Sequence, residues 1–150
     1  MGSLKFAALV LLLASPALAQ GYGVGRTPTP QELRALDISI GPTGEELPPG
    51  HGSAKEGAAL FQQKGCSGCH GKAGVGGIAP ELQSSKGKDV PIWERGRGKS
   101  GWSILPLTAP YATIVWDYIH RGMPLGHEGT LAPDEVYALT AFILAEGNIV

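Results

Sequence analysis

Cysteine and methionine are scarce in this chain. Its 150 residues include two cysteines, Cys66 and Cys69, and two methionines, one of which is the initiator. A disulfide between the two cysteines would close a loop too small to stabilise much. A zinc site would need a fourth ligand at recognisable spacing, and the remaining histidines do not offer one. Structural crosslinking is therefore a poor explanation of the two cysteines.

The chain also lacks a large excess of charge of one sign and a long apolar run. The formal net charge is −1, which argues against nucleic acid binding. An apolar run at residues 6–13 is too short to span a bilayer, which takes about 20 residues. With Lys5 before it and Ala17-Leu18-Ala19 after it, this run predicts a cleaved secretory signal at residues 1–19; an uncleaved anchor is the alternative. We expect an exported, periplasmic protein with no membrane span after cleavage.

The two cysteines belong to the stretch Cys66-Ser67-Gly68-Cys69-His70. C-x-x-C-H is the pattern of covalent c-type haem attachment. Two thiols at this spacing can add to the two vinyl groups of one haem edge, and the adjacent imidazole is then held over the iron as an axial ligand. A thioredoxin-like redox pair would instead need a βαβ setting, which is not visible here. We therefore expect one covalent haem c.

Residues 20–52 form a segment in which proline and glycine recur, as in Thr27-Pro28-Thr29-Pro30 and Pro48-Pro49-Gly50. Such residues break long elements, although Pro30 suits the first turn of a short helix over residues 31–36. The segment is nevertheless more apolar than a free linker usually is. We expect an extended arm that lies on the following domain or on a partner, with a disordered linker as the alternative.

Three longer helices are predicted in the remaining domain, residues 53–150. The first begins with a capping box formed by Ser53 and Glu56 and ends at Gly65. The second covers about residues 110–121, where apolar positions recur at helical spacing and predict one buried face. The third starts near Pro133 and is apolar on nearly every side, which predicts burial between neighbours. The predicted buried face of the second helix comprises Tyr111, Ile114, Val115, Tyr118 and Ile119.

Residues 71–109 are predicted to be mostly loop, and glycines at its start let the backbone approach a haem face closely. Within this loop, a backbone carbonyl of residues 77–80, such as that of Pro80, could accept the Nδ1 proton of His70. Such a bond would fix the orientation of the imidazole ring.

Basic side chains are concentrated in residues 86–99. A solvated loop is the ordinary interpretation of such a run. Alternatively, Arg95 or Arg97, with the indole N–H of Trp93 or Trp102, could hold the haem propionates. The segment could also dock an acidic partner. The sequence leaves these three interpretations open.

Met123 is the methionine that remains once the initiator is removed with the signal. A thioether ligand opposite His70 would raise the reduction potential, which suits an electron carrier, whereas the alternative is a methionine that fills a gap in the core. The rival ligands are His51, His120 and His127. His51 lies in the arm and His120 points away from the predicted apolar face, so His127 is the most credible alternative. Met123 is preferred.

The order of helix, C-x-x-C-H, glycine-rich loop, helix, Met-Pro and final helix resembles the class I c-type cytochromes over about residues 53–150. This resemblance implies a small, all-α, monohaem fold in which the N- and C-terminal helices pack across each other. A glycine and an aromatic residue commonly lie at that crossing. The matching candidates are Gly57, Phe61, Tyr137 and Phe142.

A narrower resemblance includes the arm. Asp37-Ile38-Ser39-Ile40, Leu47-Pro48-Pro49-Gly50 and the stretch from Trp116 to Pro124 look like the haem c subunits of bacterial sulfite and sulfane-sulfur dehydrogenases. The chain departs from them at His120 and Gly122, where arginine and alanine are more usual. This resemblance implies electron transfer rather than catalysis on this chain. It also implies a molybdenum-cofactor partner that oxidises sulfite, and a downstream cytochrome or terminal oxidase in a respiratory chain.

Three other functions stay open at this point. The chain could be a free periplasmic electron carrier, a haem enzyme or gas sensor whose iron has an open position, or a redox-silent assembly subunit. A low-spin ferric spectrum with a methionine–iron band indicates electron transfer, whereas a high-spin spectrum that shifts with cyanide indicates an open iron site.

Overall fold

The computed structural model describes residues 25–86, 89–99, 101 and 103–150. The secretory signal expected at residues 1–19 and the propionate candidate Trp102 lie outside these residues. The chain divides into two compact units, Met1–Asp37 and Ile38–Val150. None of the helices in the described part of the chain combines the length and apolar character that crossing a membrane requires.

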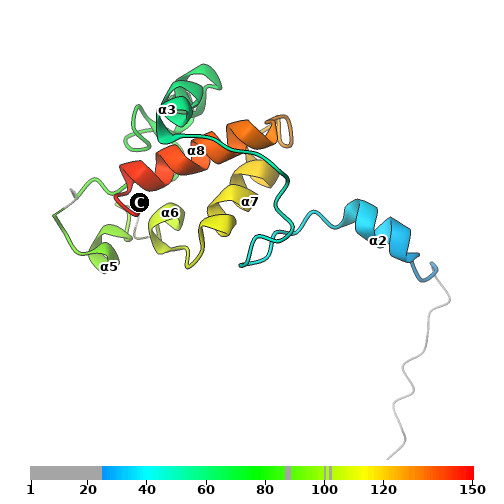
Figure 1. Cartoon of the computed structure of the whole chain (residues 1–150). Coiled ribbons are helices and arrows are strands. Elements are labelled where there is room, and N and C mark those ends of the chain that lie inside the picture. Colours follow the sequence, from blue (N-terminus) through cyan, green and yellow to red (C-terminus); the bar gives the residue numbers. More distant parts are fainter. Residues whose placement is uncertain (1–24, 87–88, 100, 102) are drawn as a thin grey trace, which may run out of the picture. The chain divides into compact units, whose positions relative to one another are not determined.

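The first unit contains helix α2, Pro30–Leu36, close to the short helix predicted there (Figure 1). Thr29 and Glu32 form a capping box at its start. Glu32 also pairs with Arg26, and this hydrogen-bonded partner lowers the pKa of Glu32 to about 2. None of the residues of α2 is buried. The helix is therefore held by its own cap and ion pair rather than by a core.

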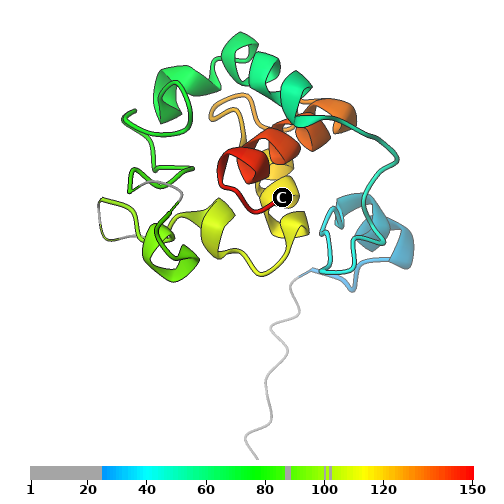
Figure 2. The same ribbon diagram turned by 60° about the vertical axis from the view of Figure 1, so that its left-hand side comes forward.

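The second unit is built from helices, and its described residues contain no strand, only an isolated bridge between Arg97 and Ser103. The all-α prediction is therefore confirmed. In Figures 1 and 2, α8 lies between α3 and α7 and contacts both. Two four-residue helices interrupt the region predicted as loop. The helices are α3 Ala54–Gln63, α4 Cys66–His70, α5 Ile92–Arg95, α6 Leu105–Thr108, α7 Ala112–Gly122 and α8 Pro133–Glu146.

Helices α3 and α8 cross at a position without a side chain. A Cβ atom at Gly57 would lie 1.9 Å from the carbonyl oxygen of Ala138, so only glycine permits this close approach. One turn further along α3, the ring of Phe61 packs on that of Phe142, with 5.2 Å between centroids. The predicted crossing of the N- and C-terminal helices is confirmed. Tyr137, the fourth candidate for this crossing, packs on Trp116 of α7 instead.

The predicted buried face of α7 is wrong in part. Tyr111, Ile114 and Tyr118 are exposed, and the helix begins after Tyr111 rather than at Pro110. Helix α8 packs against a neighbouring apolar stripe of α7. Periodicity could not predict this, since it does not set the rotation of α7 about its own axis relative to α8. The buried hydrophobic residues of α7 are Val115, Trp116 and Ile119.

Residues 38–52, which we call the strap, cross the surface of α8. The hydroxyl of Tyr137 donates to the carbonyl of Pro48 at 2.8 Å, and the backbone N–H of His51 donates to Asp134 at 2.8 Å. At Gly52, a Cβ atom would lie 2.3 Å from the backbone nitrogen of Ala138. The strap therefore belongs to the second unit, and the arm predicted over residues 20–52 is divided after Asp37.

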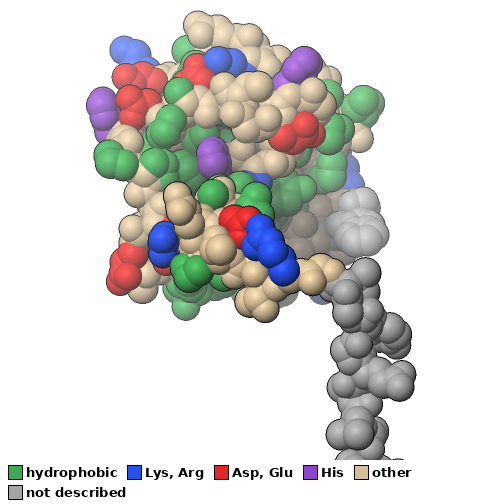
Figure 3. All heavy atoms as spheres, turned by 90° about the vertical axis from the view of Figure 1, so that its right-hand side faces the viewer, with side chains coloured by type: hydrophobic (Ala, Val, Ile, Leu, Met, Phe, Trp, Pro, Cys, Tyr) green, Lys and Arg blue, Asp and Glu red, His purple; other side chains and the backbone are tan. Residues whose placement is uncertain are grey.

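The surface mixes charges of both signs. Figure 3 shows acidic and basic side chains interspersed on one face, with hydrophobic side chains scattered among them. Several large hydrophobic side chains of the second unit are exposed, including Ile78 at 94% and Leu125 at 82%. Both flank the segments that carry the predicted iron ligands.

Candidate haem site

Helix α4 carries the C-x-x-C-H motif on a single turn and a half. Gly65, with a φ of 77°, separates α4 from α3, a left-handed conformation that glycine adopts without strain. Cys66 and Cys69 form no disulfide with each other, and residues three apart in a helix lie on the same side. Cys66 is half-buried, Cys69 is exposed and His70 is buried. Two thiols on one side with an adjacent imidazole are the donor set that covalent haem attachment requires.

The glycine-rich loop folds directly back onto α4. A Cβ atom at Gly77 would lie 1.9 Å from the carbonyl oxygen of Cys69, so a side chain at residue 77 would displace the loop. The same carbonyl accepts the backbone N–H of Ala79 at 2.9 Å. These contacts bring residues 77–80 beside the imidazole of His70.

The carbonyl oxygen of Pro80 lies 2.8 Å from Nδ1 of His70. Because a carbonyl only accepts, the contact is a hydrogen bond when Nδ1 carries the proton. Nε2 then keeps its lone pair, which a metal ion needs. This is the geometry that the proposed role of Pro80 in orienting His70 requires.

Burial raises the pKa of the Cys66 thiol above its usual value. The thiol is accordingly a weak nucleophile at neutral pH, since the reactive species is the thiolate. A free redox-active cysteine pair normally has a lowered pKa instead. The raised pKa of Cys66 therefore argues against a thiol–disulfide exchange pair.

Met123 is the C-cap residue of α7. Its backbone N–H donates to the carbonyl of Ile119 at 3.1 Å, and its half-buried side chain packs against the hydrophobic core. Both potential ligands, Met123 and His70, thus come from element ends that backbone hydrogen bonds hold in place.

The three rival histidines have other surroundings. His51 lies on the strap, exposed, with Nδ1 3.8 Å from Asp134. His127 is exposed in the loop after Met123. His120, expected at the surface or its rim, is half-buried and its ring stacks on Trp116 at 4.8 Å. Met123 remains the preferred ligand opposite His70.

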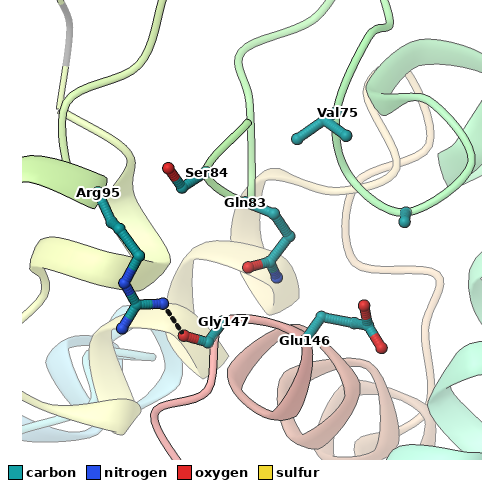
Figure 4. Close-up of a pocket in the computed structure, with 7 residues that line it drawn as sticks. Val75, Gln83, Ser84, Arg95, Glu146 and Gly147 are labelled. Atoms are coloured by element: carbon teal, nitrogen blue, oxygen red, sulfur yellow. Dashed lines mark hydrogen bonds between the residues drawn. The ribbon is translucent and has the colours of Figure 1, made fainter. Parts of the chain in front are cut away.

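The two arginines predicted as possible propionate ligands, Arg95 and Arg97, have different surroundings in the structure. Arg95 is buried, and its Nη1 donates to the carbonyl of Gly147 at 2.8 Å (Figure 4). Gln83 is also buried and donates to the carbonyl of Ile143 at 2.6 Å. Together they bind the last carbonyls of α8, where a cation is favoured by the helix dipole. Sequence reasoning missed Gln83, because a single glutamine carries no pattern that marks it as a cap.

Arg97 is exposed and lines a surface hollow of about 240 Å³ with Lys86, Trp93 and Glu94. Lys86 donates from Nζ to the carbonyl of Glu94 at 3.1 Å. The side chain of Arg97 thus lies at the surface, whereas one donor of Arg95 is already engaged by Gly147.

Comparisons with known proteins identify a family and a similar solved structure. Residues 52–143 match the family described as cytochrome c oxidase, cbb3-type, subunit III. The chain is also similar to a solved structure, the sulfane dehydrogenase SoxCD from Paracoccus pantotrophus, at 34% identity and a TM-score of 0.63. This similarity covers 87% of the present chain and 61% of the other. Among curated proteins, none matches the chain.

Proposed function

The chain belongs to the family described as cytochrome c oxidase, cbb3-type, subunit III, and from its similarity to a sulfane dehydrogenase we propose that it is the electron-transfer subunit of a sulfur-oxidising dehydrogenase. It is a class I c-type cytochrome with a covalent haem c, and it transfers electrons rather than catalysing a substrate reaction. When bound, haem supplies a one-electron couple between ferric and ferrous iron.

The residues of the site divide the work of holding that group. Cys66 and Cys69 would form the two thioether bonds, and His70 and Met123 would ligate the iron. The hydrogen-bond geometry between His70 and Pro80 would fix the imidazole plane and raise its basicity. Two iron ligands supplied by the chain itself would suit electron transfer rather than substrate binding.

The observation that carries the choice of partner is the similarity to the sulfane dehydrogenase SoxCD. The chain spans about three fifths of that chain's length (61%), so the activity of the whole protein remains a proposal for this one. The second unit, residues 38–150, makes up 113 of 150 residues, or about 75%. Since the match covers 87%, it must extend into the segment before Ile38. The arm is therefore similar as well as the haem domain.

We propose that the partner is a molybdenum-cofactor protein that oxidises sulfite in the periplasm, because residues 37–40, 47–50 and 116–124 look like those of sulfite dehydrogenase haem subunits. The partner would release two electrons per sulfite, and this chain would take them singly and pass them to a downstream cytochrome or terminal oxidase. The arm, residues 20–52, would contribute to binding the partner, since α2 buries none of its residues within the described chain.

The test is to tag the native chain, purify it under mild conditions and assay molybdenum. The expected result is a second protein that carries molybdenum in a fixed ratio to haem, and its loss when residues 20–37 are deleted. A chain that purifies alone, with a normal haem spectrum, would instead indicate a free carrier. A complex that forms unchanged without residues 20–37 would contradict the role of the arm.

A further inference from the structure

The strap is tied to α8 at consecutive turns. Tyr137 donates to the Pro48 carbonyl, and Asp134 accepts the N–H of His51. Between these bonds the chain passes so close to Tyr137 that a Cβ atom at Gly50 would lie 2.7 Å from its ring. Tyr137 is therefore the residue of α8 that contacts the strap through both its hydroxyl and its ring.

The other side of the Tyr137 ring faces α7. Its centroid lies 5.6 Å from that of Trp116, and Trp116 stacks on His120 at 4.8 Å. His120 is in the last turn of α7, the turn that ends at Met123. Three aromatic rings thus connect the strap to the element that carries the proposed iron ligand.

One face of α7 is short of hydrogen bonds. Within the described chain, four of its buried polar atoms have no hydrogen-bond partner. They recur at i, i+3, i+4 and i+7, so they form a single stripe along the helix. Near one end of the stripe, a Cβ atom at Gly44 of the strap would lie 3.3 Å from Thr113. The four atoms are Thr113 Oγ1, Trp116 Nε1, Asp117 Oδ1 and His120 Nδ1.

A buried polar atom without a hydrogen-bond partner destabilises the folded chain, and a hydrogen bond to water would remove that penalty. Lifting the strap would admit water beside Thr113, at one end of this stripe, so the closed arrangement gains less there than a fully satisfied interface would. Coupling between two sites requires an element with two states, and a weakly satisfied interface lowers the free-energy cost of the open one. The strap is also continuous with the segment before Ile38, which lies outside the second unit.

We propose that the strap and Tyr137 form a latch that positions Met123, and that release of the strap makes Met123 easier to displace from the haem iron. Tyr137 is a positioning residue in this latch, because it acts through Trp116 and the last turn of α7. This inference rests on the proposed ligation by Met123. Under the proposed function, a partner that binds the arm would act on the ligand through this latch.

The test uses the full haem-loaded chain without its partner. Imidazole is added to the ferric protein, and its competition with Met123 is followed by loss of the methionine–iron band. Tyr137→Phe keeps the ring but removes the hydrogen bond to Pro48, and Gly50→Ala displaces the strap from its own side. Each should accelerate imidazole binding by about fivefold or more. In Tyr137→Phe, hydrogen exchange of the strap amides should also rise.

Tyr118→Phe is the matched control, because Tyr118 lies on the exposed face of α7 with 56% of its surface accessible. It should bind imidazole at the wild-type rate. If the wild type shows the methionine–iron band but both strap variants behave like the control, the latch is overturned while Met123 ligation stands. A wild type without that band overturns the ligation by Met123 and the latch together. Neither result depends on the identity of the partner.

Discussion

The carbonyl oxygen of Pro80 lies 2.8 Å from Nδ1 of His70. The contact spans ten residues, and the loop between them is shaped by glycines that fit against α4. This contact would give His70 the two properties that an iron ligand needs, which are a fixed ring orientation and a free lone pair on Nε2. The orientation of the ligand is therefore built into the backbone rather than into a second side chain.

Gly77→Ala should disturb that contact. The added Cβ atom would lie 1.9 Å from the carbonyl of Cys69, so the loop must move away from α4 and weaken the hydrogen bond between His70 and Pro80. A less basic imidazole stabilises ferric iron less, so the reduction potential should rise. Potentiometric titration of the haem-loaded variant measures this shift. An unchanged or lower potential would contradict the role assigned to the Pro80 carbonyl.

Met123→Ala should open the iron site. We expect loss of the methionine–iron band, a fall in reduction potential because the thioether favours ferrous iron, and binding of cyanide to the ferric protein. Visible and near-infrared spectra with a cyanide titration provide the measurement. His127→Ala is the control and should keep the wild-type spectrum. The reverse pattern between the two variants would make His127 the ligand.

Arg95→Gln should lower the free energy of unfolding. It removes the charged hydrogen bond to Gly147, which should cost about 2 kcal/mol of unfolding free energy. Arg97→Gln, at an exposed position, should leave stability unchanged. Urea unfolding of both variants measures the difference. Equal stability of the two would show that Arg95 does not hold the end of α8.

Gly57→Ala should weaken the packing of α3 on α8. The new methyl group would lie 1.9 Å from the Ala138 carbonyl, and overpacking of this kind should cost about 3 kcal/mol. Gly122→Ala is the matched control, because a Cβ atom there would meet only Tyr118 at 3.9 Å. That variant should be neutral or slightly more stable. Thermal unfolding distinguishes the two, and a stable Gly57→Ala would contradict the observed crossing.

The ion pair between Lys64 and Glu135 joins α3 to α8 at 2.6 Å and should make stability depend on pH. Lys64 lowers the pKa of Glu135, so the pair stabilises the fold above the ordinary carboxyl pKa of about 4.3. That contribution is lost as pH falls through the depressed value. Both side chains are partly exposed, so Glu135→Gln should cost no more than about 1 kcal/mol near pH 7.

Urea unfolding of Glu135→Gln and wild type over a pH series tests this dependence. The difference between them should shrink below about pH 4. Glu45→Gln, at an exposed position of the strap, should follow the wild type throughout. A constant difference at all pH values would mean that Glu135 acts through packing rather than through its charge.

The sequence predicted the elements whose determinants are local. The Ser53–Glu56 capping box marks the start of α3, and Gly65 separates α3 from α4. The apolar run after Pro133 predicted a helix buried between neighbours, as α8 is. C-x-x-C-H carries its own chemistry, so the haem could be predicted without any knowledge of the fold.

Features that depend on contacts between distant residues could not be predicted. Helix α7 carries two adjacent apolar stripes, and only its packing against α8 decides that Trp116 is buried while Tyr118 is exposed. Nothing in the sequence places Arg95, one of the propionate candidates, beside Gly147, so its hydrogen bond to that carbonyl could not be predicted. The division of the arm at Asp37 depends on contacts between the strap and α8. The residues that make these contacts are more than 80 positions apart in the sequence.

Reduction of the haem by sulfite in the natively purified assembly tests the central claim most directly. On rapid mixing with sulfite, the account predicts that the ferrous low-spin spectrum develops within the turnover time of the assembly, with molybdenum present in a fixed ratio to haem. If a chemical reductant converts the haem fully but sulfite leaves it ferric in an assembly that contains molybdenum, this chain does not receive electrons from sulfite oxidation.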